Sequence, residues 1–248
     1  MADKANSLAV FIDYENLALG TGPAPDMSLV LERLLDKGKI LAKRAYSDWA
    51  RFPDAVSSLH ELGIELTEIP DRGMTGKNSA DIRLVVDAME LSYTKEHIDT
   101  FVIVSGDSDF TPLVSALKEN GRTVVGVGIK AATSNLLATN CDEFIYYDDL
   151  VSEIEAPAPV IDKSVPKKKQ PAYRAVFDAI ESLQRENVER MHSSLIKDTI
   201  RRKKPQFNES YYGYRSFTAL LEEAQKLGYI TMHKDARSGT WVVEGFTS

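Results

Sequence analysis

The chain has 248 residues, 43% hydrophobic and 27% charged, a composition that excludes overall disorder and allows a sizeable buried core. Its net charge of -7 hides an asymmetry: residues 1–162 hold 14 Lys and Arg against 27 Asp and Glu, whereas residues 163–248 hold 16 against 10. The single cysteine, Cys141, excludes a disulfide framework and is expected to be a small buried side chain, and the absence of a secretion signal predicts a cytoplasmic protein.

Short apolar segments alternate with segments of helical periodicity through residues 1–150. This alternation predicts an α/β domain with a doubly wound, mostly parallel sheet and helices on both faces. Ligands of such sheets bind beyond the carboxyl ends of the strands. The predicted strands cover residues 8–13, 39–46, 64–69, 100–105, 123–127 and 143–146, and helical spacing occurs at residues 29–35, 55–62, 82–89 and 113–117.

The alternation stops in residues 151–170, where prolines and lysines predict an extended linker. The remaining residues, 171–248, have the pattern of three amphipathic helices followed by a hairpin, which predicts a second, smaller winged-helix domain. The helices are expected over residues 173–183, 194–202 and 215–227, and the two strands over residues 229–233 and 240–243.

Four carboxylates stand where predicted strands end or predicted helices begin. Asp13 closes the first strand, Asp81 opens the helix before the fourth strand, and Asp107 and Asp109 directly follow the fourth strand. The first and fourth strands are often neighbours at the switch point of such a sheet, so these acids can converge. Clustered carboxylates favour Mg²⁺ or Mn²⁺, ions that promote phosphodiester hydrolysis. The alternative role of each acid is local, in a turn, a helix cap or a favourable position on the helix dipole.

Neighbouring polar residues suggest supporting roles. Asn16 is a candidate to hold or orient a metal-bound water, whereas Glu15 is expected to point away. Asp87 lies on a different helical face from Asp81 and is expected to be a solvated surface acid. Lys77 and Arg72 lie in a glycine-bearing loop and are candidate phosphate contacts, with a solvated loop position as the alternative.

The first domain resembles the NYN domain, the LabA-like branch of the PIN-like nucleases, over about residues 6–150. The resemblance rests on the segments FIDYEN at 11–16, KNSAD at 77–81, SGDSDF at 105–110 and CDEFI at 141–145, which occur in this order. It implies a metal-dependent ribonuclease whose acidic site is formed by Asp13, Asp81, Asp107 and Asp109, with Asn16 as an accessory residue.

Residues 172–245 are similar to the OST-HTH or LOTUS domain, through FTALL at 217–221, LGYI at 227–230 and WVV at 241–243. This resemblance implies RNA binding or a protein partner. Basic side chains that neutralise phosphates and tyrosines that stack on unpaired bases support RNA. The alternative is that the tyrosines pack in the core and the lysines provide solubility. The candidates are Lys167, Lys168, Lys169, Lys197, Arg201, Arg202, Lys203, Lys204, Tyr211, Tyr212 and Tyr214.

These patterns favour an endoribonuclease that prefers single strands, uses Mg²⁺ or Mn²⁺, and has RNA as its partner; a homodimer is a further expectation. A haloacid-dehalogenase-like phosphatase would need a second Asp two residues after Asp13, where this chain has Glu15. The remaining alternative is a non-catalytic RNA-binding or scaffold protein that keeps the acidic pocket only as an ion site.

Overall fold

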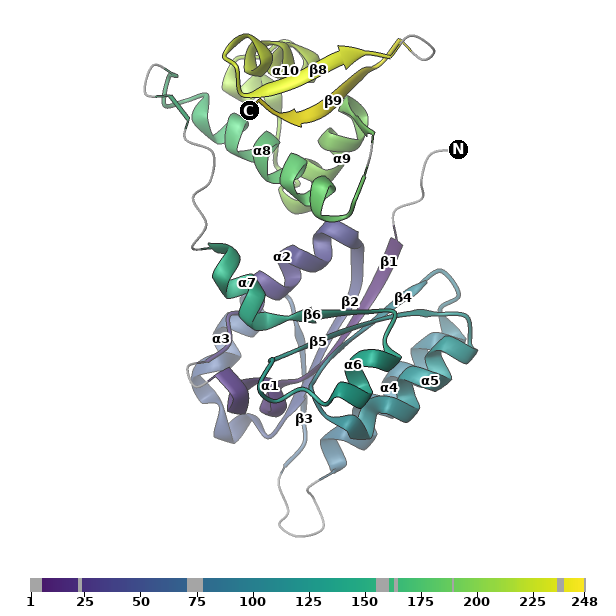
Figure 1. Ribbon diagram of the computed structural model, residues 1–248. Helices are drawn as coiled ribbons and strands as arrows, with labels where there is room; N and C mark the ends of the chain where they lie inside the picture. Colours follow the sequence, from purple (N-terminus) through teal and green to yellow (C-terminus); the bar gives the residue numbers. More distant parts are fainter. Residues whose placement is uncertain are drawn as a thin grey trace. The chain divides into compact units, whose positions relative to one another are not determined.

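The computed structural model describes residues 6–21, 24–70, 78–154, 161–162, 165–188, 190–235 and 239–247. The chain divides into two compact units, Met1–Ala156 and Pro157–Ser248 (Figure 1). None of the helices in the described ranges combines the length and the apolarity needed to cross a lipid bilayer.

The first unit is built on a six-stranded sheet in which every neighbouring pair is parallel. The strand order β3-β2-β1-β4-β5-β6 places β1 beside β4 at the switch point, as predicted. All six predicted strands are present. Their bounds are β1 (Asn6–Asp13), β2 (Gly38–Ser47), β3 (Glu65–Glu68), β4 (Thr100–Val104), β5 (Thr123–Gly128) and β6 (Glu143–Tyr146).

Helices cover both faces of this sheet (Figure 1). Alternate residues of β1 therefore enter different cores: Leu8, Val10 and Ile12 pack on one face, and Ala9 and Phe11 pack on the other. The first face carries α1 (Tyr14–Thr21), α2 (Met27–Lys37), η1 (Trp49–Arg51), α3 (Pro53–Glu61) and α7 (Tyr147–Ile154). The second carries α4 (Ser79–Thr94), η3 (Ser108–Phe110), α5 (Thr111–Glu119) and α6 (Asn135–Asn140).

Helix α4 buries a different face from the one that its apolar residues suggest. Ile82 and Val86 are 62% and 54% exposed, whereas Asp87 is buried. Tyr46 Oη donates a hydrogen bond to Asp87 Oδ2 at 2.9 Å, and Arg83 Nε donates to Asp87 Oδ1 at 2.9 Å. The prediction that Asp87 is a solvated acid is therefore wrong, because these two donors compensate the burial of its charge.

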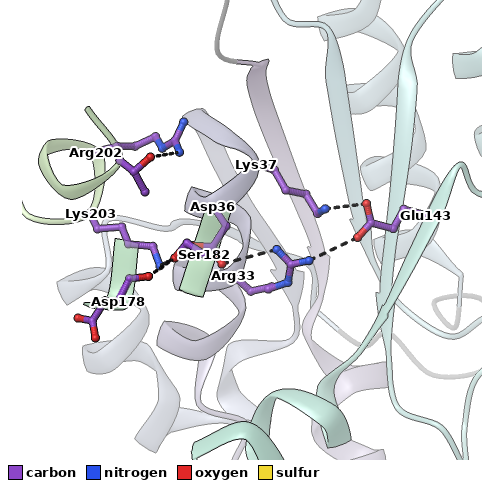
Figure 2. A network of polar contacts seen from close by, with 9 residues as sticks. Arg33, Asp36, Lys37, Glu143, Asp178, Ser182, Arg202 and Lys203 are labelled. Atoms are coloured by element: carbon purple, nitrogen blue, oxygen red, sulfur yellow. Dashed lines mark hydrogen bonds and ion pairs between the residues drawn. The ribbon is translucent and has the colours of Figure 1, made fainter. Parts of the chain in front are cut away.

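Polar contacts connect α2 to β6 near the edge of the sheet. Lys37 Nζ lies 2.6 Å from Glu143 Oε2, and Arg33 lies 3.8 Å from the other oxygen of the same carboxylate. Figure 2 shows both side chains converging on Glu143. The contacts fix an edge strand of only four residues to a helix on the first face.

The second unit combines three helices with a three-stranded antiparallel sheet of order β7-β9-β8. Its core contains apolar side chains from all three helices and from all three strands. The three predicted helices and the hairpin are present, and the two-residue strand β7 was not predicted. The elements are α8 (Gln170–Arg185), β7 (Met191–His192), α9 (Ser193–Lys203), η4 (Glu209–Tyr212), α10 (Phe217–Lys226), β8 (Ile230–Lys234) and β9 (Trp241–Phe246).

The stretch predicted as a linker contains ordered structure at both ends. Helix α7 continues through Ile154, and Val165 is 4% exposed in the core of the second unit. The linker prediction for residues 151–170 is therefore wrong at these positions. Its prolines and lysines begin only after α7 has ended, and Val165 packs because an apolar side chain next to a small core is stabilised by burial.

Candidate functional site

An acidic cavity of about 410 Å³ opens at the carboxyl ends of β1 and β4. Asp13 is the last residue of β1, and Asp107 follows β4 after a two-residue connection. Because the two strands are parallel neighbours, their ends meet at the same edge of the sheet. The described residues that line the cavity include five carboxylates and one cation: Asp13, Glu15, Asp48, Asp81, Asp107 and Arg51.

The carboxylate of Asp13 is the most buried of these acids, with 8% of the residue exposed. Burial raises the pKa of Asp13 to about 7, and the negative charge of Asp81 acts in the same direction. Two hydrogen bonds oppose this shift: the Asn16 backbone N–H donates to Oδ1 at 3.2 Å, and Ser105 Oγ donates to Oδ2 at 3.0 Å. The structure thus holds an acid of high proton affinity in a fixed orientation.

The loop after β4 is fixed to the start of α1 by side-chain hydrogen bonds. The Asp107 backbone N–H donates to Ser105 Oγ at 3.2 Å, so Ser105 bridges Asp107 and Asp13. Asn16 Oδ1 accepts a hydrogen bond from the Gly106 backbone N–H at 2.8 Å. Asn16 therefore positions the loop that carries Asp107. Sequence reasoning quoted Ser105 and Gly106 only as parts of a motif and did not assign these roles.

Asp81 lies in the first turn of α4 and faces the other acids. Burial raises its pKa, and the negative charges of Asp107, Asp109 and Glu15 raise it further. Asp107 also caps η3, because its Oδ1 accepts a hydrogen bond from the Asp109 backbone N–H at 2.9 Å. Asp109 lines an adjoining groove rather than the acidic cavity, and Asp81 lines both. Three of the four predicted acids thus share one cavity, and the fourth lies next to it.

The donor set of the cavity fits a hard divalent cation. Its five carboxylates outnumber its one cation, and burial, with the negative charge of neighbouring acids, raises the pKa of Asp13 and Asp81. Ser47 lines the same cavity with a buried hydroxyl that has no hydrogen-bond partner among the described residues. Within those residues, no group of three or more His, Cys, Asp or Glu is placed to hold an ion. Mg²⁺ commonly binds through one or two carboxylates and several waters, so the arrangement is compatible with it.

Two residues near Asp13 differ from expectation. Glu15 lines the cavity and contributes to the raised pKa of Asp81, so the prediction that it points away is wrong. It is held there by an ion pair with Arg51, whose Nη1 lies 2.5 Å from Glu15 Oε1. Arg51 was missed because η1 has no sequence signal that relates it to Asp13. The candidate phosphate contacts Arg72 and Lys77 lie outside the described residues.

Cys141 is half-buried and is not among the residues that line the cavity. Burial raises the pKa of its thiol to about 11, which keeps the side chain protonated near neutral pH and makes it a poor nucleophile.

The basic candidates of the second unit fall into two groups. Several have partners within the unit: Lys169 Nζ lies 2.8 Å from Glu223 Oε1, and Lys197 Nζ lies 2.6 Å from Glu209 Oε1. Lys203 Nζ donates to Ser182 Oγ at 2.7 Å (Figure 2). Lys204 pairs with Asp178, and Arg202 contacts Thr199. The exposed candidates are Lys167, Lys168, Arg201, Lys204 and Tyr211, so Lys204 is both exposed and paired.

The tyrosines behave differently from one another. Tyr211 is 72% exposed, with Lys168 Nζ 5.8 Å from its ring centroid, and Tyr212 is half-buried against Phe207. Tyr214 is buried, and its hydroxyl donates to Tyr173 Oη at 2.8 Å. Tyr214 therefore follows the alternative of packing in the core, because the side chain completes the small core and satisfies its hydroxyl there.

Comparison with known proteins assigns the first unit. The family model of the NYN domain matches residues 7–153, so the chain belongs to the NYN family, and its first unit has a PIN-like nuclease fold. The uncharacterized protein MJ0482 of Methanocaldococcus jannaschii is 27% identical over 120 residues, which are 48% of this chain and 47% of that protein. The chain thus matches about half the length of this curated relative.

The solved structures that match this chain include two whose likeness to it differs in extent. A crystal structure of VPA0982, a protein of unknown function from Vibrio parahaemolyticus, matches 60% of this chain and 98% of its own, with 22% identity and a TM-score of 0.52. This likeness supports the fold alone. A structure of the Aeropyrum pernix ORC1 protein in complex with DNA has 14% identity and covers 98% of this chain and 84% of its own. Its TM-score of 0.24 is too low to indicate a common fold.

Proposed function

We propose that the chain is a divalent-metal-dependent endoribonuclease that prefers single-stranded RNA. The observation that carries the proposal is the convergence of Asp13, Asp81 and Asp107 on one cavity at the carboxyl ends of β1 and β4. Like-charged side chains that share a cavity destabilise one another unless protons or cations neutralise them. Membership of the NYN family, a family of nucleases in general, supports the same activity.

Asp13, Asp81 and Asp107 are the residues that would hold Mg²⁺ or Mn²⁺, with Asp109 at the margin of the site. A bound ion of this kind supplies a Lewis acid for the scissile phosphate and lowers the pKa of an attacking water. Ser105 and the Asn16 backbone N–H keep Asp13 oriented toward the cavity. Through Gly106, the Asn16 side chain fixes the loop that bears Asp107.

Arg51 is the phosphate contact in this proposal. It is the one cation among the described residues that line the acidic cavity, and its ion pair with Glu15 holds the guanidinium at the cavity wall. A planar guanidinium binds phosphate oxygens through two parallel hydrogen bonds. An acidic site that acts on a polyanion needs such a contact to offset the repulsion between substrate and carboxylates.

The second unit is proposed to be a winged-helix, LOTUS-like module that adds RNA affinity. Its element order of helix, short strand, two helices and hairpin supports the winged-helix assignment. The exposed basic residues Lys167, Lys168 and Arg201, with Tyr211 beside Lys168, support nucleic-acid binding. The paired residues Lys169 and Lys197 are assigned to the stability of the unit instead.

The test uses the purified full chain, end-labelled single-stranded RNA and Mn²⁺, in parallel with EDTA and with the Asp107→Asn variant. We expect internal cleavage by the wild type and its loss in both controls. Circular dichroism and gel filtration of the variant establish that it is folded. Cleavage that survives EDTA, or that Asp107→Asn performs at the wild-type rate, contradicts the proposal.

A non-catalytic RNA-binding protein is the second candidate. The observation that favours it is that no group of three ligands is preformed among the described residues. The same assay separates the candidates, since RNA binding by gel shift without cleavage at any tested Mn²⁺ or Mg²⁺ concentration supports this reading.

A further inference from the structure

An apolar groove of about 680 Å³ adjoins the acidic cavity. It lies between α4, the segment from η3 to the start of α5, and α6, and we call it the base groove. Its wall exposes large apolar side chains: Ile82, Val86 and Leu136 are 62%, 54% and 57% exposed. Exposed apolar side chains gathered around a concavity are unusual on a protein surface and mark a binding site.

The base groove adjoins the acidic cavity, because Asp81 lines both. Asp109 lies on the groove side and is electrostatically coupled to Asp81. A group bound in the base groove therefore lies next to whatever the acidic cavity binds. In a polynucleotide, the group next to a phosphate is a nucleoside.

The charge of the groove selects among the parts of a nucleotide. The described lining of the base groove has the acids Asp81 and Asp109 and no Lys or Arg, whereas the acidic cavity has Arg51 and the carboxylates that would hold a cation. A phosphate is therefore favoured in the acidic cavity and repelled from the base groove. A neutral aromatic base stacks on apolar side chains, and its amino group donates to a carboxylate.

We propose that the base groove binds a nucleobase that carries an exocyclic amino group, next to the phosphate held in the acidic cavity. Ile82, Val86 and Leu136 provide the apolar surface, and Asp109 accepts the hydrogen bond from the amino group. This inference rests on the proposed function, because it takes the ligand to be a nucleotide of the strand to be cut. It predicts that cytosine, adenine and guanine, which carry an exocyclic amino group, are preferred over uracil at that position.

The direct test is a methyl NMR titration of the full chain in EDTA, where no cleavage can occur. Cytidine and cytidine 5′-monophosphate are expected to shift the methyl signals of Ile82, Val86 and Leu136 saturably. Uridine should shift them more weakly, because it lacks the amino group, and ribose 5-phosphate should leave them in place. Methyl signals that do not respond to cytidine, that respond equally to uridine, or that respond equally to ribose 5-phosphate overturn the proposal.

A pair of variants on α4 provides a matched control. Val86→Ser removes apolar surface from the base groove and should weaken cytidine binding about fivefold. Tyr93→Ser changes a residue of the same helix that is 66% exposed and is not among the residues that line the groove, and it should leave binding unchanged. Equal effects of the two substitutions would contradict the assignment of the groove.

The two proposals can fail separately. Cleavage of RNA by a protein whose groove methyl signals do not respond to cytidine overturns the base groove and leaves the nuclease intact. Cytidine-dependent shifts in a protein that never cleaves RNA overturn the nuclease and leave a nucleoside-binding groove.

Discussion

The two units of the chain differ in how their charged side chains are neutralised. The described residues that line the acidic cavity include five carboxylates, of which Asp13 is one, and one arginine. In the second unit, Lys169 and Lys197 pair with glutamates at 2.8 and 2.6 Å, although this part of the sequence has an excess of basic residues.

This difference separates charged side chains that stabilise the fold from charged side chains that are available to bind a ligand. A paired lysine on a small domain contributes modestly to its fold and has little attraction left for a ligand. Arg51 is also paired, with Glu15, but a guanidinium has five N–H donors and can contact a carboxylate and a phosphate together. Acids with raised pKa values are held together at a cost in stability, and such a cost is typical of functional sites. The formal charge of a segment therefore predicts a binding surface less well than the partners of each side chain do.

The largest expected effect comes from removing one acid of the cavity. Asp81→Asn keeps the size of the side chain and removes a charge that would hold the ion, so RNA cleavage should fall about 10³-fold. Glu90→Gln changes an exposed acid of the same helix and should leave the rate unchanged. Single-turnover cleavage rates measure both variants, and equal rates for Asp81→Asn and the wild type would remove Asp81 from the site.

The next effect is expected from Asp13→Asn, which should gain stability and lose activity. Asp13 has a pKa of about 7 in the folded chain against 3.8 ordinarily, so the folded state binds more protons than the unfolded chain between these values. In EDTA, the free energy of unfolding should therefore fall as the pH rises from about 4 to about 7. Asp13→Asn removes the buried charge, keeps one acceptor oxygen and replaces the other with an amide donor, so it should be more stable than wild type at pH 8 by roughly 2–4 kcal/mol.

Urea denaturation at several pH values measures this difference. The gain should shrink toward zero as the pH falls below about 4, because Asp13 then becomes protonated in both the folded and the unfolded state. A variant that is less stable than the wild type at pH 8 would show that the Asp13 carboxylate is not destabilised by its burial.

A smaller effect is expected from the loop that positions Asp107. A Cβ at Gly106 would lie 2.6 Å from the Ala132 carbonyl oxygen, so Gly106→Ala must displace the loop. We expect a loss of about 1–3 kcal/mol of stability and at least a roughly tenfold loss of cleavage. Gly121→Ala is a control that is strained by its φ of +72° but has no atom within 4 Å of the added Cβ, so it should lose stability without losing activity. Equal loss of activity in both variants would refute a positioning role for Gly106.

The smallest effects test whether the exposed cations of the second unit bind RNA while its paired lysines stabilise the fold. Arg201→Ala removes an exposed cation and should weaken RNA binding about two- to threefold, with a salt dependence lower by about one unit. Lys169→Ala leaves Glu223 without its partner and should lower thermal stability with little effect on RNA affinity. Fluorescence anisotropy at several salt concentrations and thermal melts compare the two variants, and a reversal of their effects would contradict the division.

Much of the architecture could be predicted from the sequence because it follows from local patterns. Buried parallel strands such as β1 are uninterrupted apolar runs, and the alternation of strands and helices dictates the doubly wound sheet. Asp13 and Asp107 could be assigned to one edge because Asp13 ends β1 and Asp107 follows the neighbouring strand β4 after two residues. Short helices such as α1 and α6 were missed because six to eight residues give too little periodicity.

Contacts between residues distant in sequence account for the structural features that the sequence did not predict. Asp87 is buried because Tyr46, from another element, donates to it, and Arg51 reaches the acidic cavity through its pair with Glu15. The exposure of Ile82 and Val86 could not be predicted from the sequence either, because helical spacing predicts an apolar face but not whether another element covers it.

The central claim is that Asp13, Asp81 and Asp107 together capture a divalent cation, and a Mn²⁺-soaked crystal tests it most directly. An anomalous difference map should show Mn²⁺ in the acidic cavity, with carboxylate oxygens of at least two of these residues about 2.0–2.3 Å from the ion. A well-ordered cavity without an anomalous peak at saturating Mn²⁺, or a peak bound only elsewhere, would contradict the account.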